Sequence, residues 1–548
     1  MKKSHSNKLP KNQHAVQLIG LDKLILNKSK EIIGPAAYQI LCRIEAVGLC
    51  FSDLKFLKQF SLHPRKSRIL SGIDPEILEQ IPSYVPGDAA AVPGHETVIR
   101  IEAVGEGVKK FEPGQRYLVQ TDYRWLSTAN SNAALGYNFE GALQEYVLMD
   151  ERIITTPEGD SMLIPASENL SSSAVALVEP WACVEDAYAG KERKGLKTDG
   201  KTLIVSDMQL SEGIFRQLFN QYGKPASITR ISKQEEMHGH ASLYYDDIIY
   251  FGSDVETVEK LFSKLGTHGL LNIVLCGGSF SRDVNVPVGR IHYSYIRIIG
   301  TRGNNPADSY EYIPESGEVR PGDKINIVGA AGPMGLMHVV RNLCHDIAGL
   351  SVFAGDIDDT RLARLTKIAE PLAKKNHVEY RPYNSKKEKA NTSFDYTILM
   401  TPIPGLVSES LQAAAENGII NIFAGIPANV FTGIDLNTYI KKKLYLIGTS
   451  GSTIDDMKTV LSRVEAGKLD TNTSIAAISG LDGAVDGIRA VENRSIPGKI
   501  IVYPACKGLG LTTLEELSAK MPDVASLLND GLWTKQAEQK LLEKYGKT

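Results

Sequence analysis

An internal repeat of strand, turn and helix patterns is the feature that most constrains what this chain can fold into. The stretches HGLLNIVLCGGS and YIRIIGTRGNN resemble NGIINIFAGIPA and KLYLIGTSGST further along, so that Gly269 and Asp246 correspond to Gly418 and Asp395, 149 residues later. At the first strands the offset is 123 residues (329 minus 206). Such repeats indicate tandem copies of one unit, and alternating strands and helices predict a parallel sheet covered on both faces. We therefore expect an α/β fold; chance similarity between two such halves is the alternative.

The second copy opens with a glycine-rich turn in KINIVGAAGPMGLMHVV. Gly332 would let a pyrophosphate approach the backbone, Gly335 would allow the helix to pack closely on the strand, and the helix N-terminus offers free N–H groups. Gly329 stands one place before the usual first glycine, so the match is a variant. Asp356 ends the strand-like LSVFAGD and is expected to bind a ribose 2′-hydroxyl, which favours NAD over NADP. The predicted cofactor-binding residues are Gly329, Gly332, Pro333, Met334, Gly335 and Asp356.

The first copy lacks these features. It begins KTLIVSDMQLSEGIF, where Ser206, Asp207 and Gln209 replace small residues or glycine and only Gly213 remains. The later stretch ITRISKQEEM offers no acid at a strand end. We expect this copy to be Rossmann-like but without a cofactor, so that each chain binds one nicotinamide cofactor. In the second copy, Asp356 has an alternative interpretation as a solvated acid at a strand end, and Asp358 and Asp359 are nearby competitors for the ribose.

Composition and charge exclude several classes of function. Lys and Arg number 61 against 64 Asp and Glu, so no overall field attracts nucleic acid or anionic lipid. No apolar run reaches the roughly 18 residues of a membrane span. The six cysteines are scattered, and no apolar leader opens the sequence, which favours a cytoplasmic protein without disulfides.

A β-rich region precedes the repeat. Between residues 15 and 153, short alternating runs are broken by Gly and Pro, which predicts a small barrel-like domain. Residues 55–93 are longer than a connection needs and are expected to form an excursion over a cleft. Residues 511–548 have helical spacing, with Thr512 or Thr513 as a cap, and are expected to serve packing or subunit contact.

Three separated stretches could together build one metal site. Cys50 stands in VGLCFSDLK, His95 and Glu96 in VPGHETV, and Glu179 in LVEPWACVEDAY. Thiolate, imidazole and carboxylate suit tetrahedral zinc, and three protein ligands with an exchangeable fourth position are typical of a catalytic site. Taken singly, each residue also has a structural interpretation, as a buried thiol, a loop histidine or a charge at a helix N-terminus.

The combination of GLCFSDLK, PGHE, EPGQRYLV, GALQEYVLMDE and VEP resembles the zinc-containing medium-chain alcohol and sorbitol dehydrogenases. This resemblance implies a GroES-like β-barrel catalytic domain in which Cys50, His95 and Glu96 bind zinc, with Glu179 close to the metal or its water. Residues 201–322, the 55–93 segment and the C-terminal tail have no counterpart in the family pattern.

The resemblance also implies roles around the metal. Ser52 takes the position of the hydroxyl that relays the alcohol proton, and Asp53 the position of the acceptor that orients the imidazole of His95. Family members often carry a second, structural zinc on four closely spaced cysteines. Residues 117–141 contain no cysteine, so we expect one catalytic zinc and no structural zinc.

The sequence as a whole predicts a zinc-dependent oxidoreductase that transfers a hydride between NAD(H) and a polyol, sugar or sugar phosphate, assembled as a dimer or tetramer. The alternatives are an NAD-dependent lyase or epimerase with transient oxidation, and a non-catalytic binding or scaffold protein. The expected parts are a GroES-like domain over 1–195 completed by 452–506, a degenerate Rossmann-like domain over 196–322, an NAD-binding Rossmann domain with a doubly wound parallel sheet over 323–451, and a helical extension over 507–548.

Overall fold

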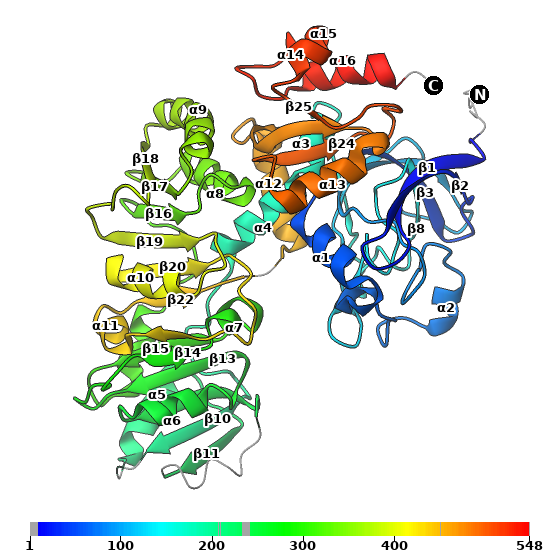
Figure 1. The fold of residues 1–548 in the computed structure, drawn as a ribbon. Coiled ribbons are helices and arrows are strands. Elements are labelled where there is room, and N and C mark those ends of the chain that lie inside the picture. The colour runs from blue at the N-terminus through cyan, green and yellow to red at the C-terminus, as the bar shows by residue number, and fades with distance from the viewer. Residues whose placement is uncertain (1–8, 207, 209, 233–241, 450, 547–548) are drawn as a thin grey trace. The chain divides into compact units, whose positions relative to one another are not determined.

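The computed structural model describes residues 9–206, 208, 210–232, 242–449 and 451–546 (Figure 1). The chain divides into unit one, which combines Met1–Ala182 with Thr453–Thr548, and unit two, Cys183–Ser452. Unit one therefore joins the two ends of the chain, whereas unit two is continuous in sequence.

Unit one is built on a mixed sheet whose strands come from both ends of the chain. Strand β3 (Gln39–Gly48) pairs antiparallel with β4 (Glu96–Val104), and β24 (Lys499–Val502) pairs with the end of β3 through Ile501 opposite Gly48. Nearly every residue of β3 is buried, as expected for a central strand covered on both faces. The other strands of this sheet are β5 (Arg116–Val119), β8 (Tyr146–Asp150), β9 (Leu163–Pro165), β23 (Ile475–Ser479) and β25 (Thr512–Thr513).

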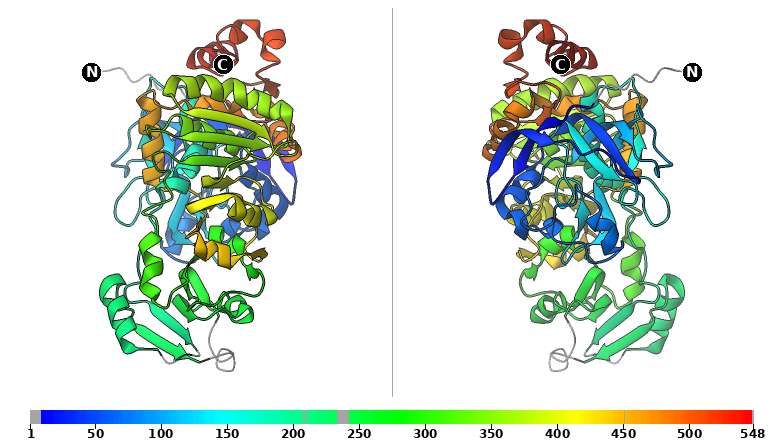
Figure 2. Two further views of the ribbon diagram at one scale, coloured as in Figure 1. Left: turned by 90° about the vertical axis from the view of Figure 1, so that its left-hand side faces the viewer. Right: turned by 90° about the vertical axis from the view of Figure 1, so that its right-hand side faces the viewer.

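Two hairpins lie outside this sheet. Strands β1 (Asn12–Leu18) and β2 (Leu24–Glu31) form the long blue hairpin in the right-hand view of Figure 2, and β6 (Asp122–Ser127) pairs with β7 (Asn132–Ala134). The helices of unit one outside the segments described next are α3 (Ser172–Ala176), α4 (Val178–Ala189, which continues into unit two), α12 (Ile454–Glu465), η5 (Thr471–Ser474), η6 (Leu481–Gly483) and α13 (Ala484–Asn493).

The segment 55–93 folds into short helices that pack on the core of unit one. It contains most of α1 (Phe51–Gln59), then η1 (Phe60–Leu62), η2 (Pro64–Lys66) and α2 (Pro75–Glu79). Asp74 caps α2 by accepting the backbone N–H of Glu76 at 2.9 Å. Leu57, Leu78 and Ile81 are buried in the core, so apolar contacts hold this segment in place.

The C-terminal helices begin later than the sequence indicates. Thr512 and Thr513 form strand β25, and the first helix, α14 (Leu517–Lys520), starts only at Leu517. Thr513 and Glu516 nevertheless form the two reciprocal hydrogen bonds of a capping box. This box lies directly before α14 rather than in its first turn. Helix α15 (Pro522–Ala525) follows, then α16 (Lys535–Tyr545). Glu538 of α16 accepts the N–H groups of Ser172 and Ser173 at 2.5 and 2.9 Å, which fixes this helix to α3.

Unit two contains the two sequence repeats as parallel sheets, which confirms the expected fold class. Copy one, residues 201–301, has the strand order β11-β10-β12-β13-β15, and copy two, residues 324–447, has the order β18-β17-β16-β19-β20-β22. The strands of copy one are β10 (Lys201–Ser206), β11 (Ser227–Ile231), β12 (Tyr245–Phe251), β13 (Leu265–Val274) and β15 (Arg297–Thr301). Those of copy two are β16 (Lys324–Val328), β17 (Ser351–Asp356), β18 (Glu379–Asn384), β19 (Phe394–Leu399), β20 (Ala414–Ile422) and β22 (Tyr445–Ile447).

Helices connect the strands of both copies, and a further strand pair joins the copies. Copy one carries α5 (Glu212–Tyr222), α6 (Val255–Leu261) and α7 (Val288–Tyr293), with η4 (Pro306–Tyr312) after its last strand. Copy two carries α8 (Pro333–Leu343), α9 (Asp359–Asn376), α10 (Gly405–Ala413) and α11 (Leu436–Lys441). Strand β14 (Val284–Val286) of copy one pairs with β21 (Thr432–Ile434) of copy two.

One helix and one strand explain why the repeat offset changes along the sequence. The offset rises from 123 to 149 residues, a difference of 26. Copy two inserts α9 and β18 at this point, residues 359–384, and the described part of copy one has no counterpart of them. No helix among the described residues is long and apolar enough to cross a membrane.

Candidate functional site

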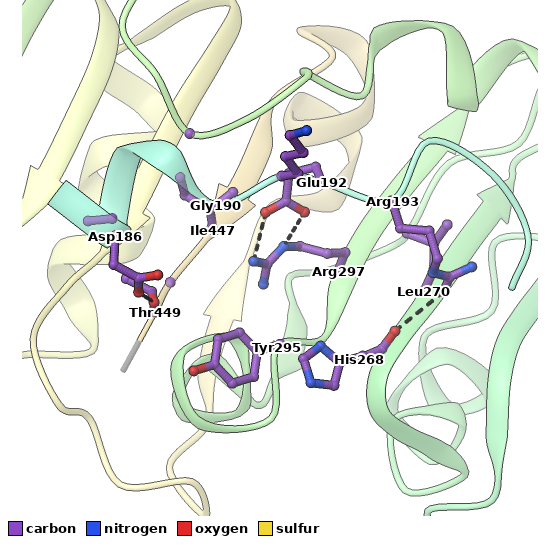
Figure 3. A pocket seen from close by; sticks show the side chains of 14 residues that line it. Asp186, Gly190, Glu192, Arg193, His268, Leu270, Tyr295, Arg297, Ile447 and Thr449 are labelled. Atoms are coloured by element: carbon purple, nitrogen blue, oxygen red, sulfur yellow. Dashed lines mark hydrogen bonds and ion pairs between the residues drawn. The ribbon is translucent and has the colours of Figure 1, made fainter. Parts of the chain in front are cut away.

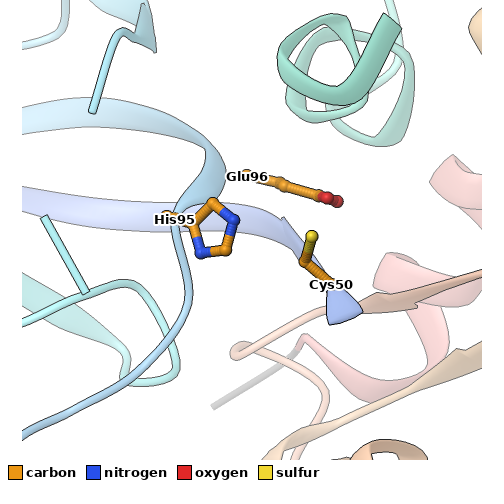
Figure 4. Close-up of side chains that lie close together, drawn as sticks. All are labelled: Cys50, His95 and Glu96. Carbon is orange, nitrogen blue, oxygen red and sulfur yellow. The ribbon is translucent and has the colours of Figure 1, made fainter. Parts of the chain in front are cut away.

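Three of the predicted metal ligands come together in unit one. Cys50 directly precedes α1, while His95 and Glu96 stand where β4 begins. Because Gly48 at the end of β3 pairs with Glu96, the antiparallel register brings these two chain segments side by side. One ligand atom from each of Cys50, His95 and Glu96 lies within 4.8 Å of the others (Figure 4). A side chain at Gly48 would meet the Glu96 carboxylate, its Cβ only 2.2 Å from Oε2, so glycine leaves the room that this carboxylate occupies.

Ser52 and Asp53 contact the same group. The Ser52 hydroxyl donates to Cys50 Sγ at 3.0 Å and lies 3.2 Å from His95 Nε2. Asp53 Oδ1 lies 3.3 Å from His95 Nδ1, and its other oxygen accepts the backbone N–H of Cys50 at 3.0 Å. One carboxylate therefore positions both the imidazole and the backbone that carries the thiol.

Glu96 is held by a residue that the sequence analysis missed. Lys499, the first residue of β24, donates to Glu96 Oε1 at 2.5 Å and to the Leu49 carbonyl at 2.9 Å. Burial alone would lower the pKa of Lys499, but the Glu96 carboxylate raises it above its usual value. Since 403 residues separate the two partners, no local pattern could have indicated this pair.

Glu179, the fourth predicted ligand, lies outside the three-residue group. It is the second residue of α4 and is partly buried. Burial raises the pKa of Glu179 to about 7; the Glu96 carboxylate also raises it, whereas His95 and Lys499 act in the opposite direction.

Aromatic rings form one side of the site. The Tyr137 ring centroid lies 5.8 Å from that of His95 and 4.9 Å from that of His63, on which it stacks. His63 belongs to the 55–93 segment. No motif in the sequence indicated that this segment places a ring next to Tyr137 at the site. Burial, followed by the charge of Arg65, lowers the pKa of His63 to about 4, so this ring is neutral at physiological pH.

The donor set fits a zinc ion. Glu96 Oε2 is buried and has no hydrogen-bond partner in the described part of the chain, an arrangement that costs free energy unless a cation or water satisfies it. A thiol, an imidazole and a carboxylate converge on the same small volume. These are the ligand types of catalytic zinc.

The glycine-rich turn of copy two connects β16 to α8. Gly329 has φ +86°, which only glycine adopts readily, and a Cβ at Gly335 would lie 2.3 Å from the Gly329 carbonyl oxygen. Gly332 is the N-cap of α8, and a Cβ there would meet nothing closer than 3.7 Å. Pro333 and Met334 form the first turn of the helix. The turn therefore packs closely between Gly329 and Gly335, whereas the space next to Gly332 is open.

Asp356 ends β17 beside this turn. Its Oδ2 accepts the N–H of Ala331 at 3.0 Å, and Oδ1 accepts those of Ile357 and Asp358 at 2.8 and 3.2 Å. The two competing acids have other partners. Asp358 caps α9, and Asp359 pairs with Lys387 and Asn384.

The corresponding part of copy one differs. Strand β10 ends at Ser206, and α5 begins at Glu212 after the cap Ser211. Lys201 pairs with Ser227 in copy one, and Lys324 pairs with Ser351 at the corresponding place in copy two. Asp356 stands five residues after Ser351, and the residue five places after Ser227 is Ser232. Asp207 and Gln209 are two of the residues for which copy one is expected to bind no cofactor, and both lie outside the described residues.

Two further features of unit two involve none of the predicted site residues. A cavity of about 340 Å³ is lined by Arg193 and Arg297, but Arg193 pairs with Asp247. Arg297 binds Glu192 through two hydrogen bonds (Figure 3). A cluster of Glu185, Glu318 and His345 surrounds Arg341, which pairs with both glutamates at 3.1 and 2.6 Å. These groups are engaged in structural ion pairs.

Comparison with known proteins identifies the N-terminal domain. Residues 36–158 match the alcohol dehydrogenase GroES-like domain. The chain is 28% identical over 272 residues to YggP of Escherichia coli strain K12, covering 45% of this chain and 63% of that protein. It is 27% identical over 234 residues to L-sorbose 1-phosphate reductase of Klebsiella pneumoniae, covering 41% and 56%. Mannitol-1-phosphate 5-dehydrogenase of Aliivibrio fischeri is 24% identical over 289 residues, covering 49% and 65%. The chain thus spans less than two thirds of each relative's length.

Solved structures share the fold. The 2R,3R-butanediol dehydrogenase of Bacillus subtilis superposes with a TM-score of 0.53 at 15% identity, covering 90% of this chain and all of that one. The structure of AibC gives 0.51 at 13% identity, covering 92% and 99%. The chain therefore contains a region that matches the alcohol dehydrogenase GroES-like domain, and it shares the fold of these solved structures.

Proposed function

We propose that the chain is a zinc- and NAD-dependent dehydrogenase that interconverts an alcohol and a carbonyl group on a polyol, sugar or sugar phosphate. The observation that carries this proposal is the convergence of Cys50, His95 and Glu96 in a GroES-like domain. The names of the relatives, L-sorbose 1-phosphate reductase and mannitol-1-phosphate 5-dehydrogenase, support the substrate class. In this proposal 1–195 with 452–506 is the catalytic domain, 323–451 binds NAD, 196–322 does not, and 507–548 is a structural extension.

Cys50, His95 and Glu96 would hold the zinc, with Glu179 beside it. Zinc bound there would lower the pKa of a coordinated hydroxyl by several units, toward neutral pH. The Ser52 hydroxyl, which already reaches Cys50 Sγ and His95 Nε2, is positioned to relay the proton of the substrate alcohol, taking up that proton while it passes its own proton outward to solvent. Asp53 keeps the imidazole oriented so that Nε2 faces the site.

The remaining groups would bind the cofactor. The open face of Gly332 and the N-terminus of α8 suit a pyrophosphate, and Asp356 suits a ribose hydroxyl while repelling a 2′-phosphate. The bound cofactor would supply the hydride chemistry, and the part of copy two is to hold and orient it.

Metal analysis with a substrate screen tests the proposal. We expect about one zinc per chain and NADH formation with at least one polyol, sugar or sugar phosphate. Cys50→Ser should lose the zinc and the turnover while keeping its circular dichroism spectrum, whereas Cys344→Ser, a change outside the site, should behave as wild type. Full activity of Cys50→Ser, or two tightly bound zinc ions per chain, would contradict the proposal. Turnover without net NADH would instead favour the lyase or epimerase alternative.

A further inference from the structure

The two copies in unit two meet through strands that correspond to one another. Strand β14 of copy one pairs antiparallel with β21 of copy two, with Val284 opposite Ile434 and Asn285 opposite Gly433. Under the repeat offset of 149, position 284 corresponds to 433 and position 285 to 434. If each residue is replaced by its counterpart in the other copy, the pair Val284–Ile434 becomes the pair Gly433–Asn285, which is the second pair observed. This is the register that a two-fold axis between the copies produces.

Two glycine contacts repeat the same symmetry. A Cβ at Gly448 of copy two would lie 2.9 Å from His292 Cα of α7, and a Cβ at Gly300 of copy one would lie 2.8 Å from the Ile440 side chain of α11. The glycines are 148 residues apart, and so are the residues that contact them. Each copy thus presents the same helix to the same glycine of the other copy.

The seam between the copies has the character of a core. We call the seam the surface where β14, α7 and β15 meet β21, α11 and β22. Figure 1 shows α7, β14 and β15 next to α11 and β22. One continuous apolar cluster of buried residues crosses it, with members from both sides. They include Val284, Val286 and Ile291 from copy one and Ile434, Leu436 and Tyr439 from copy two. Permanent interfaces between identical subunits resemble such a domain core cut in half.

We infer that copy one is a built-in partner for copy two, occupying the place of a second, identical domain. The seam is an isologous interface formed within one chain rather than between two chains. Copy one covers β21 and β22, which would otherwise be open edges ready to pair with another molecule. In this role copy one needs its core and its seam surface but not a glycine-rich turn. This explains why copy one has a parallel sheet without that turn. Any assembly of whole chains uses other surfaces.

Cross-linking in the full-length protein tests whether the seam forms within one chain. In Asn285→Cys with Gly433→Cys, the two thiols stand opposite each other, and a Cβ at Gly433 meets nothing closer than 3.4 Å. A short bismaleimide should give a product with the mass of one chain at every protein concentration. The single variant Asn285→Cys controls for the native cysteines. A product with the mass of two chains, or no cross-link beyond that control, overturns the inference.

A second variant tests whether copy one protects the edge of copy two. A Cβ at Gly289 of α7 would lie 2.0 Å from the Pro427 carbonyl oxygen across the seam, whereas a Cβ at Gly405 meets nothing within 4 Å. Gly289→Ala should speed hydrogen–deuterium exchange of residues 432–434 and 445–447 by at least about tenfold and produce concentration-dependent dimers in light scattering. Gly405→Ala should change neither. Unchanged exchange in folded Gly289→Ala would overturn the inference, and the cross-linking result remains decisive if that variant fails to fold.

Discussion

Copy one and copy two share a seam and the order of five parallel strands, but the glycine-rich turn with Gly329, Gly332 and Gly335 belongs to copy two. Gly335 of copy two packs so closely that a Cβ would lie 2.3 Å from the backbone of Gly329, while Gly213 of copy one has no atom closer than 3.4 Å to such a Cβ. Asp356 of copy two has Ser232 as its counterpart. The parallel sheet of copy one therefore forms without the glycine-rich turn, because its apolar core and the turn depend on different residues.

The largest expected effect separates these two glycines. Gly335→Ala should force α8 away from β16, because the added methyl group meets backbone that cannot rotate aside. A lost hydrogen bond to a charged group costs about 1.5–3 kcal/mol, so we expect NADH affinity to fall by about 10- to 150-fold in isothermal titration calorimetry. Gly213→Ala is the matched control in copy one and should leave the affinity within about twofold of wild type.

The same titration gives the number of cofactors per chain. We expect a stoichiometry near one, since only copy two combines the glycine-rich turn with an acid at the end of its second strand. A stoichiometry near two that falls by half in a Ser206 or Gly213 variant would show that copy one is a working second site. The comparison between the copies would then fail.

Cofactor preference gives the next effect. Asp356→Gly should reduce the ratio of NAD to NADP efficiency by about 5- to 150-fold, which corresponds to about 1–3 kcal/mol for a lost hydrogen bond and a lost repulsion. Because Asp356 also accepts three backbone N–H groups, Asp356→Asn is needed to separate charge from turn structure. Ser232→Gly is the control in copy one. A wild-type preference for NADP would show that Asp356 does not select the cofactor.

Residues in short motifs could be predicted from the sequence, whereas distant partners could not. Cys50, His95 and Glu96 were recognisable because their surroundings form motifs, and the repeat indicated two parallel sheets. Lys499 was missed because its partner Glu96 stands at the far end of the sequence. The symmetric seam was missed because strand register between β14 and β21 arises only from tertiary packing. The helix start at Leu517 was misplaced because Thr512 and Thr513 pair with β23 instead.

The smallest expected effect is a dependence of stability on pH, which arises from a difference between the first helices of the two copies. Helix α5 of copy one buries Phe215 and Leu218, but α8 of copy two buries His338. Burial, with a smaller contribution from Arg341, lowers the pKa of His338 to about 3. Its Nδ1 lies 2.9 Å from the Tyr188 hydroxyl, and its Nε2 is buried with no hydrogen-bond partner among the described residues, so no acceptor is present there to hold an additional proton.

This histidine should make unit two less stable as the pH falls. The unfolded chain binds a proton on His338 near its ordinary pKa of about 6.5, whereas the folded chain stays neutral until about pH 3. The stabilisation is therefore complete above pH 6.5 and declines below it, by about 0.7 kcal/mol between pH 7 and pH 6. His338→Leu should remove this part of the pH dependence, since leucine has no proton to bind. Denaturant unfolding of both proteins at the two pH values measures the difference, in which contributions from other titrating groups cancel. Equal pH dependence in wild type and variant would mean that His338 titrates normally in the folded protein and that its burial in α8 is less complete than the structure indicates.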